Sequence, residues 1–403
     1  MKIQLLSRCH RIAVTASVAS LAALRTLAQD WAPQPAAEPK NAGVSIWTQN
    51  VSGFRKEHGS VGGYTKRWDL SDLPHYVPKA HLSGTLRIWG NNYLTDGPLG
   101  DYWREAFAKF QPDLKIEYHL PTGAIAVSAV AAGVADLGMN YKATLTDRLI
   151  FEQVFHHPVT EVAALTGSFD VYGWGPPGII VVHRDNPLTR LSLKQLDGIF
   201  GGARIGGYQG SVWHTEYPYS RGPEENIRTW GQLGLTGEWA DKPIHVGGQN
   251  LSAGAMVQFS NEVLYGSLQF VEGYKAFTNY ITPQGEVNSW SLQARRQIAT
   301  DKYCIFYVSP SSLSPEMKEL ALQAREGGPY VMRTLETVHD RTYPLTHTSY
   351  FYLNRDPGKP VDSRVSEFLH FVLSQEGQDC VQHEGRYIPL TGRMVGEQLK
   401  KID

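Results

Sequence analysis

The sequence predicts an α/β protein with two lobes, and three observations lead to this fold class. Apolar strands alternate with amphipathic helices from Gly84 onward, which is typical of βαβ units. The alternation is found on both sides of a long middle segment. The chain has 403 residues, enough for two or three domains at about 100 to 200 residues each, and 42% of its residues are hydrophobic.

The first elements indicate a largely parallel sheet. Thr85 to Trp89 is expected to be a strand, and a helix should follow it because its apolar residues recur at helical spacing: Leu99, Trp103, Ala106, Phe107 and Phe110. A second strand from Lys115 to Leu120 then leads into a helix of small residues. A strand, a helix and a strand in this order favour parallel pairing, with helices covering the sheet.

The later elements continue the alternation. Ile179 to His183 should be a buried strand, and Ser192 to Phe200 a helix that begins with Ser192 and Gln195 as a capping pair. Cys304 to Val308 is expected to be a further strand. The chain should close with a strand from Tyr350 to Leu353 and a helix that carries Val365, Phe368, Leu369, Val372 and Leu373.

The N-terminus predicts export. Basic residues precede an apolar run from Ile12 to Leu24, and small residues before Gln29 offer a cleavage site after Ala28. This run is shorter than the roughly 20 residues that span a bilayer, so a cleaved signal in residues 1–28 is favoured over an uncleaved anchor. The mature protein is then expected in the periplasm, with residues 29–82 as a tether and N-terminal extension.

Composition and motifs exclude several function classes. The formal net charge of -1 gives no basic surface for nucleic acid. The sequence has no GxSxG elbow, HExxH, CxxC or P-loop, so we expect no cofactor, no metal site and no enzymatic activity. Cys304 and Cys380 could pair in an oxidising compartment, but Cys304 lies in an apolar run and could equally be a small buried residue.

One glycine fingerprint is rejected as a dinucleotide site. Gly173, Gly175 and Gly178 have the GxGxxG spacing. Two prolines lie where a phosphate-binding helix needs free N–H groups, and a β run follows instead of a helix.

Four predicted strand ends carry small polar residues just before a helix. Helix N-termini present unpaired N–H groups and the positive end of a dipole, so several of them facing one cleft would bind an oxyanion. Ordinary helix capping by the same residue types is the alternative for each position taken singly. The positions are Asn91 and Asn92; Thr122 and Gly123; Asn140, Tyr141 and Lys142; and Asn250, Ser252 and Gly254.

From Gly84 to Leu390 the order of motifs resembles the phosphate-binding proteins of bacterial ABC transporters, which have the type II periplasmic binding fold. The resemblance is carried by these stretches: Gly84–Gly90; Ala131–Gly138; Ile179–Gly202, which includes Asn186, Pro187 and Leu188; Ile227–Leu233; Pro243–Ile244; Ser252–Leu264; Phe368–Gln378; and Tyr387–Leu390.

The resemblance implies two lobes that close on a ligand about a hinge and an interlobe cleft. The first lobe would consist of residues 83–180 and 346–403, and the second of residues 181–345, with crossovers near Gly178 and Leu345. Residues 203–225 then form an insertion.

The resemblance also implies a function without catalysis. The protein would be a monomer that captures phosphate or a related small oxyanion and delivers it to a membrane permease. The ligand would be bound by Asn91, Asn92, Thr122, Gly123, Asn140, Tyr141, Lys142, Gln249, Ser252 and Gly254.

Several of these residues depart from the family pattern. Gln249 stands where the family usually has an arginine, and Ser252–Ala255 replaces its Ser-Gly-Thr turn. One alternative is therefore a sensory or scaffold protein that kept the fold with an altered or lost ligand. A hydrolase is the other, with Ser252 and His347 as its only suggested nucleophile and base.

Overall fold

The computed structural model describes residues 63–171 and 173–403. The expected signal in residues 1–28 and the tether up to residue 62 lie outside the described residues. Within the described part, no helix combines the length and the apolar character needed to cross a bilayer.

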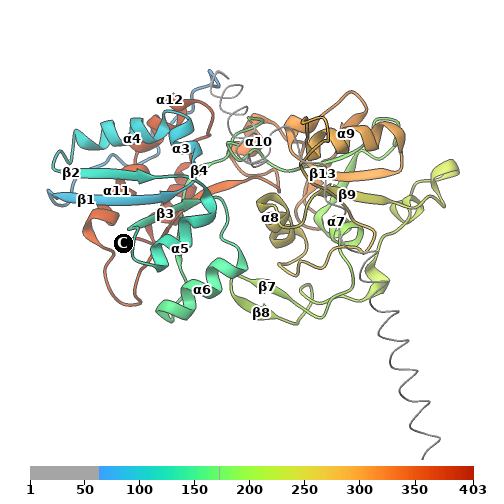
Figure 1. The fold of residues 1–403 in the computed structure, drawn as a ribbon, viewed down its shortest axis with the longest axis horizontal. Coiled ribbons are helices and arrows are strands. Elements are labelled where there is room, and N and C mark those ends of the chain that lie inside the picture. The colour runs from blue at the N-terminus through green and yellow to red at the C-terminus, as the bar shows by residue number, and fades with distance from the viewer. Residues whose placement is uncertain (1–62, 172) are drawn as a thin grey trace, which may run out of the picture. The chain divides into compact units, whose positions relative to one another are not determined.

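The first sheet has five strands in the order β2-β1-β3-β16-β4. Strands β1 (Gly84–Gly90), β2 (Leu114–His119) and β3 (Leu137–Asn140) are parallel, with β1 between the other two. Strand β16 (Thr348–Leu353) runs antiparallel to both β3 and β4 (Thr160–Thr166). A strand from the far end of the chain therefore completes this sheet (Figure 1).

Helices cover both faces of the first sheet. Apolar residues from α4 (Leu99–Ala108), α11 (Ser363–Val372) and α12 (Gln375–Glu384) form the core on one face. The other face packs against α5 (Ala126–Ala131) and α6 (Leu145–Phe155). The predicted apolar stripe is confirmed for Leu99, Trp103 and Phe107, which are fully buried, whereas Ala106 is partly buried and Phe110 lies beyond the end of α4.

The N-terminal extension contributes to this core. Residues 63–82 contain no helix or strand, yet Leu70, Leu73 and Tyr76 are buried in the apolar cluster of the first sheet. The Tyr76 hydroxyl donates to Glu367 Oε2 on α11 at 2.5 Å. Irregular apolar contacts of this kind leave no periodic pattern in a sequence, so the sequence predicts only a tether and extension in this region.

The second sheet has the order β10-β9-β13-β5-β14. Strand β9 (His245–Gln249) lies parallel to β10 (Lys275–Phe277) on one side and to β13 (Cys304–Val308) on the other. Strand β5 (Ile179–His183) runs antiparallel to β13 and to β14 (Met317–Glu319). The core on one face of the second sheet includes residues of α7 (Leu193–Phe200) and α8 (Gly254–Val263). The core on its other face includes residues of α9 (Trp290–Thr300).

These two mixed sheets, each with helices on both faces, confirm the predicted α/β class (Figure 1). The predicted capping pair of α7 is present, since Gln195 N donates to Ser192 Oγ at 3.1 Å and Ser192 N donates to Gln195 Oε1 at 2.9 Å. The chain leaves the first sheet after β4 and returns to it at β16. The hinge at these two crossovers stays a prediction.

Residues 203–225, the expected insertion, contain the hairpin of β7 (Gly207–Gln209) and β8 (Val212–His214) and the 3₁₀ turn η2 (Pro223–Glu225). Two arginines of this segment bond to Asp197 of α7. Arg204 Nη1 and Nη2 donate to the two carboxylate oxygens of Asp197 at 2.5 and 2.9 Å, and Arg221 Nη2 donates to the Asp197 carbonyl at 3.0 Å.

The remaining elements are short. They are α3 (Tyr93–Asp96), η1 (Gly123–Ile125), β6 (Arg190–Ser192), η3 (Trp230–Leu233), η4 (Gly237–Trp239), η5 (Pro310–Ser312), β15 (Ala321–Gln323), α10 (Leu335–His339) and α13 (Gly392–Leu399). Strands β11 (Tyr280–Ile281) and β12 (Val287–Asn288) pair with each other as a separate hairpin. Cys304 and Cys380 are both free thiols.

Candidate functional site

Both sheets have a topological switch point, and the predicted ligand residues follow the strands at these points. The chain runs from β1 to β2 on one side of β1 and then crosses to β3 on the other side. The strand order therefore reverses at β1. Strand β9 has the same position between β10 and β13. Crevices outside the carboxyl ends of such strands are where α/β sheets bind ligands. Asn91 follows β1 directly, and Asn250 follows β9 directly.

The loop after β1 holds a buried amide with unused donor capacity. Asn91 is only 2% exposed, and its Oδ1 accepts a hydrogen bond from Tyr93 N at 3.1 Å. Its Nδ2 makes no hydrogen bond of full geometry among the described residues, and its only interaction there is with the Tyr141 hydroxyl. Leaving a buried donor unpaired costs about 1 to 3 kcal/mol, so a further acceptor beside this amide would be stabilising. Asn92 differs, because its Nδ2 already donates to Asp96 Oδ2 at 2.5 Å.

The loops after β2 and β3 lie side by side. A methyl group on Gly123 would come within 2.2 Å of Asn140 Oδ1, so a larger residue there would force the Asn140 side chain to move. Thr122 Oγ1 accepts from Ala124 N at 3.4 Å, and Asn140 Oδ1 accepts from Tyr141 N at 2.8 Å. Three of the predicted residues are therefore neighbours at one edge of the first sheet.

Tyr141 has its hydroxyl committed elsewhere. The hydroxyl donates to the Gly173 carbonyl at 2.5 Å, and burial raises its pKa far above the usual value. A side chain on Gly175, which has φ +65°, would collide with the Tyr141 ring. These contacts indicate a packing role for Tyr141. They also give the glycines of the GxGxxG spacing a structural role. As predicted, the strand β5 and not a helix follows these glycines.

Lys142 is the cation among the predicted ligand residues. Its Nζ lies 3.7 Å from Glu262 Oε1 on α8. Burial opposes its charge, but the electrostatic influence of Tyr350, Glu262 and Glu161 outweighs burial and raises the pKa of Lys142. Lys142 is thus charged at neutral pH, with part of that charge compensated by Glu262.

The loop after β9 presents a helix N-terminus. The backbone at the start of this loop is held by Tyr274, whose hydroxyl donates to the Gln249 carbonyl at 2.8 Å. Ala253 occupies the N-cap of α8 and cannot cap it with a side chain. The backbone N–H groups of Gly254 and Ala255 have no partner among the described residues. Uncapped helix starts of this kind favour negative charge near their free N–H groups.

The suggested hydrolase pair has no catalytic geometry. Ser252 Oγ donates to Asn250 Oδ1 at 2.6 Å, whereas His347 Nε2 has no hydrogen-bond partner in the described part of the chain. Burial lowers the pKa of His347 to about 4. A catalytic serine needs its base within hydrogen-bond reach, so the structure gives this alternative no support.

One surface cavity lies away from all predicted ligand residues. It measures about 700 Å³ and is lined by residues of β1, β2, α3, α4 and the loop before β3: Arg87, Trp89, Thr95, Arg104, Ile116, Glu117, Tyr118, His119 and Val134. Arg87 in this cavity is already paired with Asp136 at 3.0 Å. No sequence motif indicates this cavity, and none of the predicted ligand residues lines it.

Comparisons with known proteins agree with the motif order. A sequence model described as PBP superfamily domain matches residues 174–376. The "Phosphate-binding protein PstS" of Pseudomonas aeruginosa is 28% identical over 331 residues, which is 82% of this chain and 90% of that protein.

Solved structures overlap with the chain more loosely. "PstS from Borrelia burgdorferi" is 14% identical with a TM-score of 0.47, and covers 77% of this chain and 100% of its own. "An ABC-type phosphate transport receptor from Vibrio cholerae" is 17% identical with a TM-score of 0.44, and covers 75% of this chain and 99% of its own.

Proposed function

Because the chain belongs to the PBP superfamily, we propose that it captures phosphate or a related small oxyanion and hands it to a membrane ABC transporter without chemical change. The observation that carries this proposal is the placement of unpaired donors at both switch points. Asn91 Nδ2 belongs to the first sheet, and the N–H groups of Gly254 and Ala255 follow β9 of the second. Donors without acceptors suit an anion that offers only acceptors.

The predicted ligand residues divide into two groups on this basis. Asn91, Thr122, Gly123, Asn140, Gln249 and Gly254 remain proposed ligand donors, and Lys142 remains the proposed cation. Ser252 donates both its hydroxyl and its N–H to Asn250 Oδ1, so its proposed role is to shape the loop after β9. Asn92 and Tyr141 have their polar groups bonded within the first lobe, so their proposed role is to hold the loops in place.

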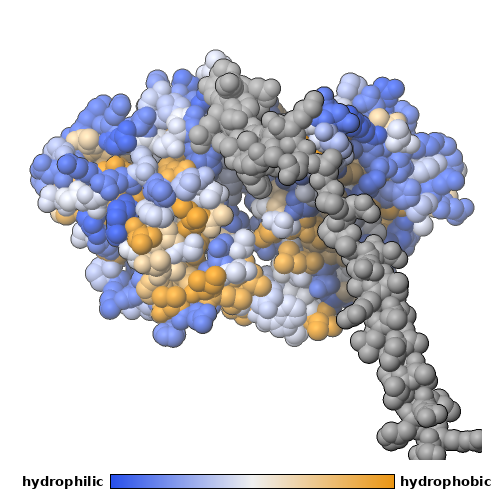
Figure 2. Space-filling view, in the orientation of Figure 1, coloured by the Kyte–Doolittle hydropathy of each residue, from blue (hydrophilic) through white to orange (hydrophobic). Residues whose placement is uncertain are grey.

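The proposal places the mature protein in the periplasm as a monomer. Three large apolar side chains on α6 are 44–52% exposed: Leu149, Ile150 and Val154. Figure 2 shows hydrophobic surface over this helix. Exposed apolar patches mark protein interaction sites, so we assign this patch to contact with the transporter permease.

A thermal-shift screen of the full mature protein tests the proposal. Bound ligand stabilises a folded protein by RT ln(1 + [L]/Kd), so phosphate should raise the melting temperature in a saturable way. Sulfate, sugars and amino acids are the comparison ligands. A sensory or scaffold protein with a lost ligand predicts no shift with phosphate, and a hydrolase predicts turnover of a phosphoester.

Closure of the lobes is a separate expectation. Small-angle scattering with saturating phosphate should show a smaller radius of gyration than the free protein, because interlobe sites are assembled by hinge motion. An unchanged radius at saturation would contradict closure while leaving binding itself intact.

A further inference from the structure

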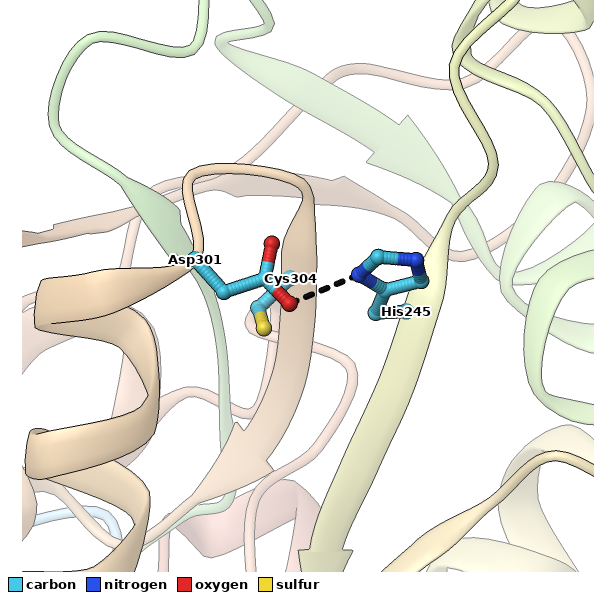
Figure 3. Close-up of side chains that lie close together, drawn as sticks. All are labelled: His245, Asp301 and Cys304. Carbon is cyan, nitrogen blue, oxygen red and sulfur yellow. Dashed lines mark hydrogen bonds and ion pairs between the residues drawn. The ribbon is translucent and has the colours of Figure 1, made fainter.

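A histidine, an aspartate and a cysteine meet at the amino end of the second sheet, at the opposite end of β9 from the proposed oxyanion site. His245 begins β9, Cys304 begins β13, and Asp301 is the C-cap of α9. Their ligand atoms, one from each side chain, all lie within 4.8 Å of one another. Figure 3 shows the three side chains gathered beside the loop that joins α9 to β13.

The local fold explains why these side chains converge. Cys304 and His245 are register partners on adjacent parallel strands, so their side chains leave the sheet on the same face. Helix α9 packs on that face and ends at Asp301, three residues before β13 begins. Two strands and one helix end therefore fix the cluster.

The carboxylate is already oriented toward the histidine. Tyr303 N donates to Asp301 Oδ1 at 3.0 Å, which holds one oxygen in place. The other oxygen, Oδ2, lies 2.7 Å from His245 Nδ1 (Figure 3). A metal ligand whose orientation is fixed by an outer hydrogen bond needs less ordering when an ion binds.

We propose that His245 Nδ1, Asp301 Oδ2 and Cys304 Sγ form a site for a divalent transition-metal ion of borderline softness, with Zn²⁺ as the best match. Imidazole, carboxylate and thiolate are the three ligand types that Zn²⁺ takes in proteins. One carboxylate and one thiolate together neutralise the charge of the ion. As the metal–sulfur bond forms, the thiol proton is released to solvent.

The geometry needs only a small adjustment. Tetrahedral Zn²⁺ with ordinary bond lengths separates its ligand atoms by about 3.3 to 3.6 Å. The His245–Asp301 pair would open slightly from 2.7 Å, and the widest separation would close by about 1 Å from its limit of 4.8 Å. The His245 side chain is 48% exposed, so an ion can enter from solvent and keep a water as its fourth ligand.

Cobalt titration of the full mature protein, purified without a histidine tag, tests this site. Co²⁺ should bind with one-to-one stoichiometry and produce a thiolate-to-metal charge-transfer band, and Zn²⁺ should displace it. His245→Ala should weaken Zn²⁺ binding by more than the roughly 10- to 100-fold that loss of an outer-shell partner costs. This change alters an exposed side chain, so it should leave folding intact.

Two cysteine variants complete the test. Cys304→Ser should abolish the charge-transfer band, while Cys380→Ser, the matched control in the first lobe, should retain it. A Co²⁺ spectrum without the band, or a band that survives in Cys304→Ser, would overturn the proposal. Unchanged Zn²⁺ affinity in His245→Ala would overturn it as well. Phosphate binding is measured in parallel and does not depend on this site.

Discussion

Replacing Gln249 by arginine should increase the affinity for phosphate. The loop that carries Gln249 is fixed through its backbone, since the Tyr274 hydroxyl bonds the Gln249 carbonyl at 2.8 Å. The side chain can therefore be exchanged without moving the chain. Lys142, the cation among the proposed ligand residues, is already close to Glu262. An arginine would add a positive charge that the site now lacks.

The size of the effect follows from the donors that each side chain offers. Glutamine brings neutral N–H groups beside an acceptor oxygen, whereas arginine brings a charged planar fork that can bond two phosphate oxygens. Hydrogen bonds to charged groups are worth about 1.5 to 3 kcal/mol, against roughly 1 kcal/mol for neutral ones. We expect a gain of about 0.5 to 2 kcal/mol, which lowers Kd about two- to thirtyfold.

Titration calorimetry with phosphate at one ionic strength measures this gain. Gln153→Arg is the matched control, because it adds the same charge on the exposed side of α6. The control should bind phosphate like the wild type. If Gln249→Arg folds normally and binds phosphate no better than the control, then Gln249 does not face the ligand and the assignment of this loop is wrong.

Three further predictions concern charge, pH and docking. Lys142→Gln should weaken phosphate binding by roughly 10-fold or more in calorimetry, because a charge-assisted contact is lost; an unchanged Kd would remove Lys142 from the site. Burial lowers the pKa of His347 to about 4 from its usual 6.5, so the unfolded state binds more protons between these pH values. The free energy of unfolding should have its full value above pH 6.5 and fall by up to about 1.4 kcal/mol per pH unit as the pH is lowered to 4. In urea unfolding, His347→Gln should flatten this slope. Ile150→Glu should reduce phosphate uptake by cells but leave phosphate binding unchanged; normal uptake would contradict the docking role of α6.

Most of the fold could be predicted from the sequence because local patterns specified it. The apolar stripe of α4 and the capping pair of α7 are short-range signals, and both appear in the structure. Strand β5 has the predicted bounds, Ile179–His183, because all its residues but the last are fully buried and the run is continuously apolar. Such signals do not depend on contacts between distant residues.

The site was less predictable because the partners of its polar groups come from distant parts of the sequence. Two contacts show this. Tyr141 bonds to Gly173, which is 32 residues away in the sequence, and Lys142 faces Glu262, which is 120 residues away. The cluster of His245, Asp301 and Cys304 was missed for the same reason. Its spacing matches no metal motif, and only the register of β9 with β13 brings the ligands together.

The central claim is that phosphate binds where the two switch points present unpaired donors. Calorimetric titration of the mature protein with phosphate, repeated with Asn91→Leu, tests it most directly. We expect one-to-one saturable binding, weakened in the variant by about tenfold or more, because a hydrogen bond to a charged ligand is worth about 1.5 to 3 kcal/mol. Absence of saturable phosphate binding in the folded wild type, or an unchanged Kd in folded Asn91→Leu, would contradict the claim.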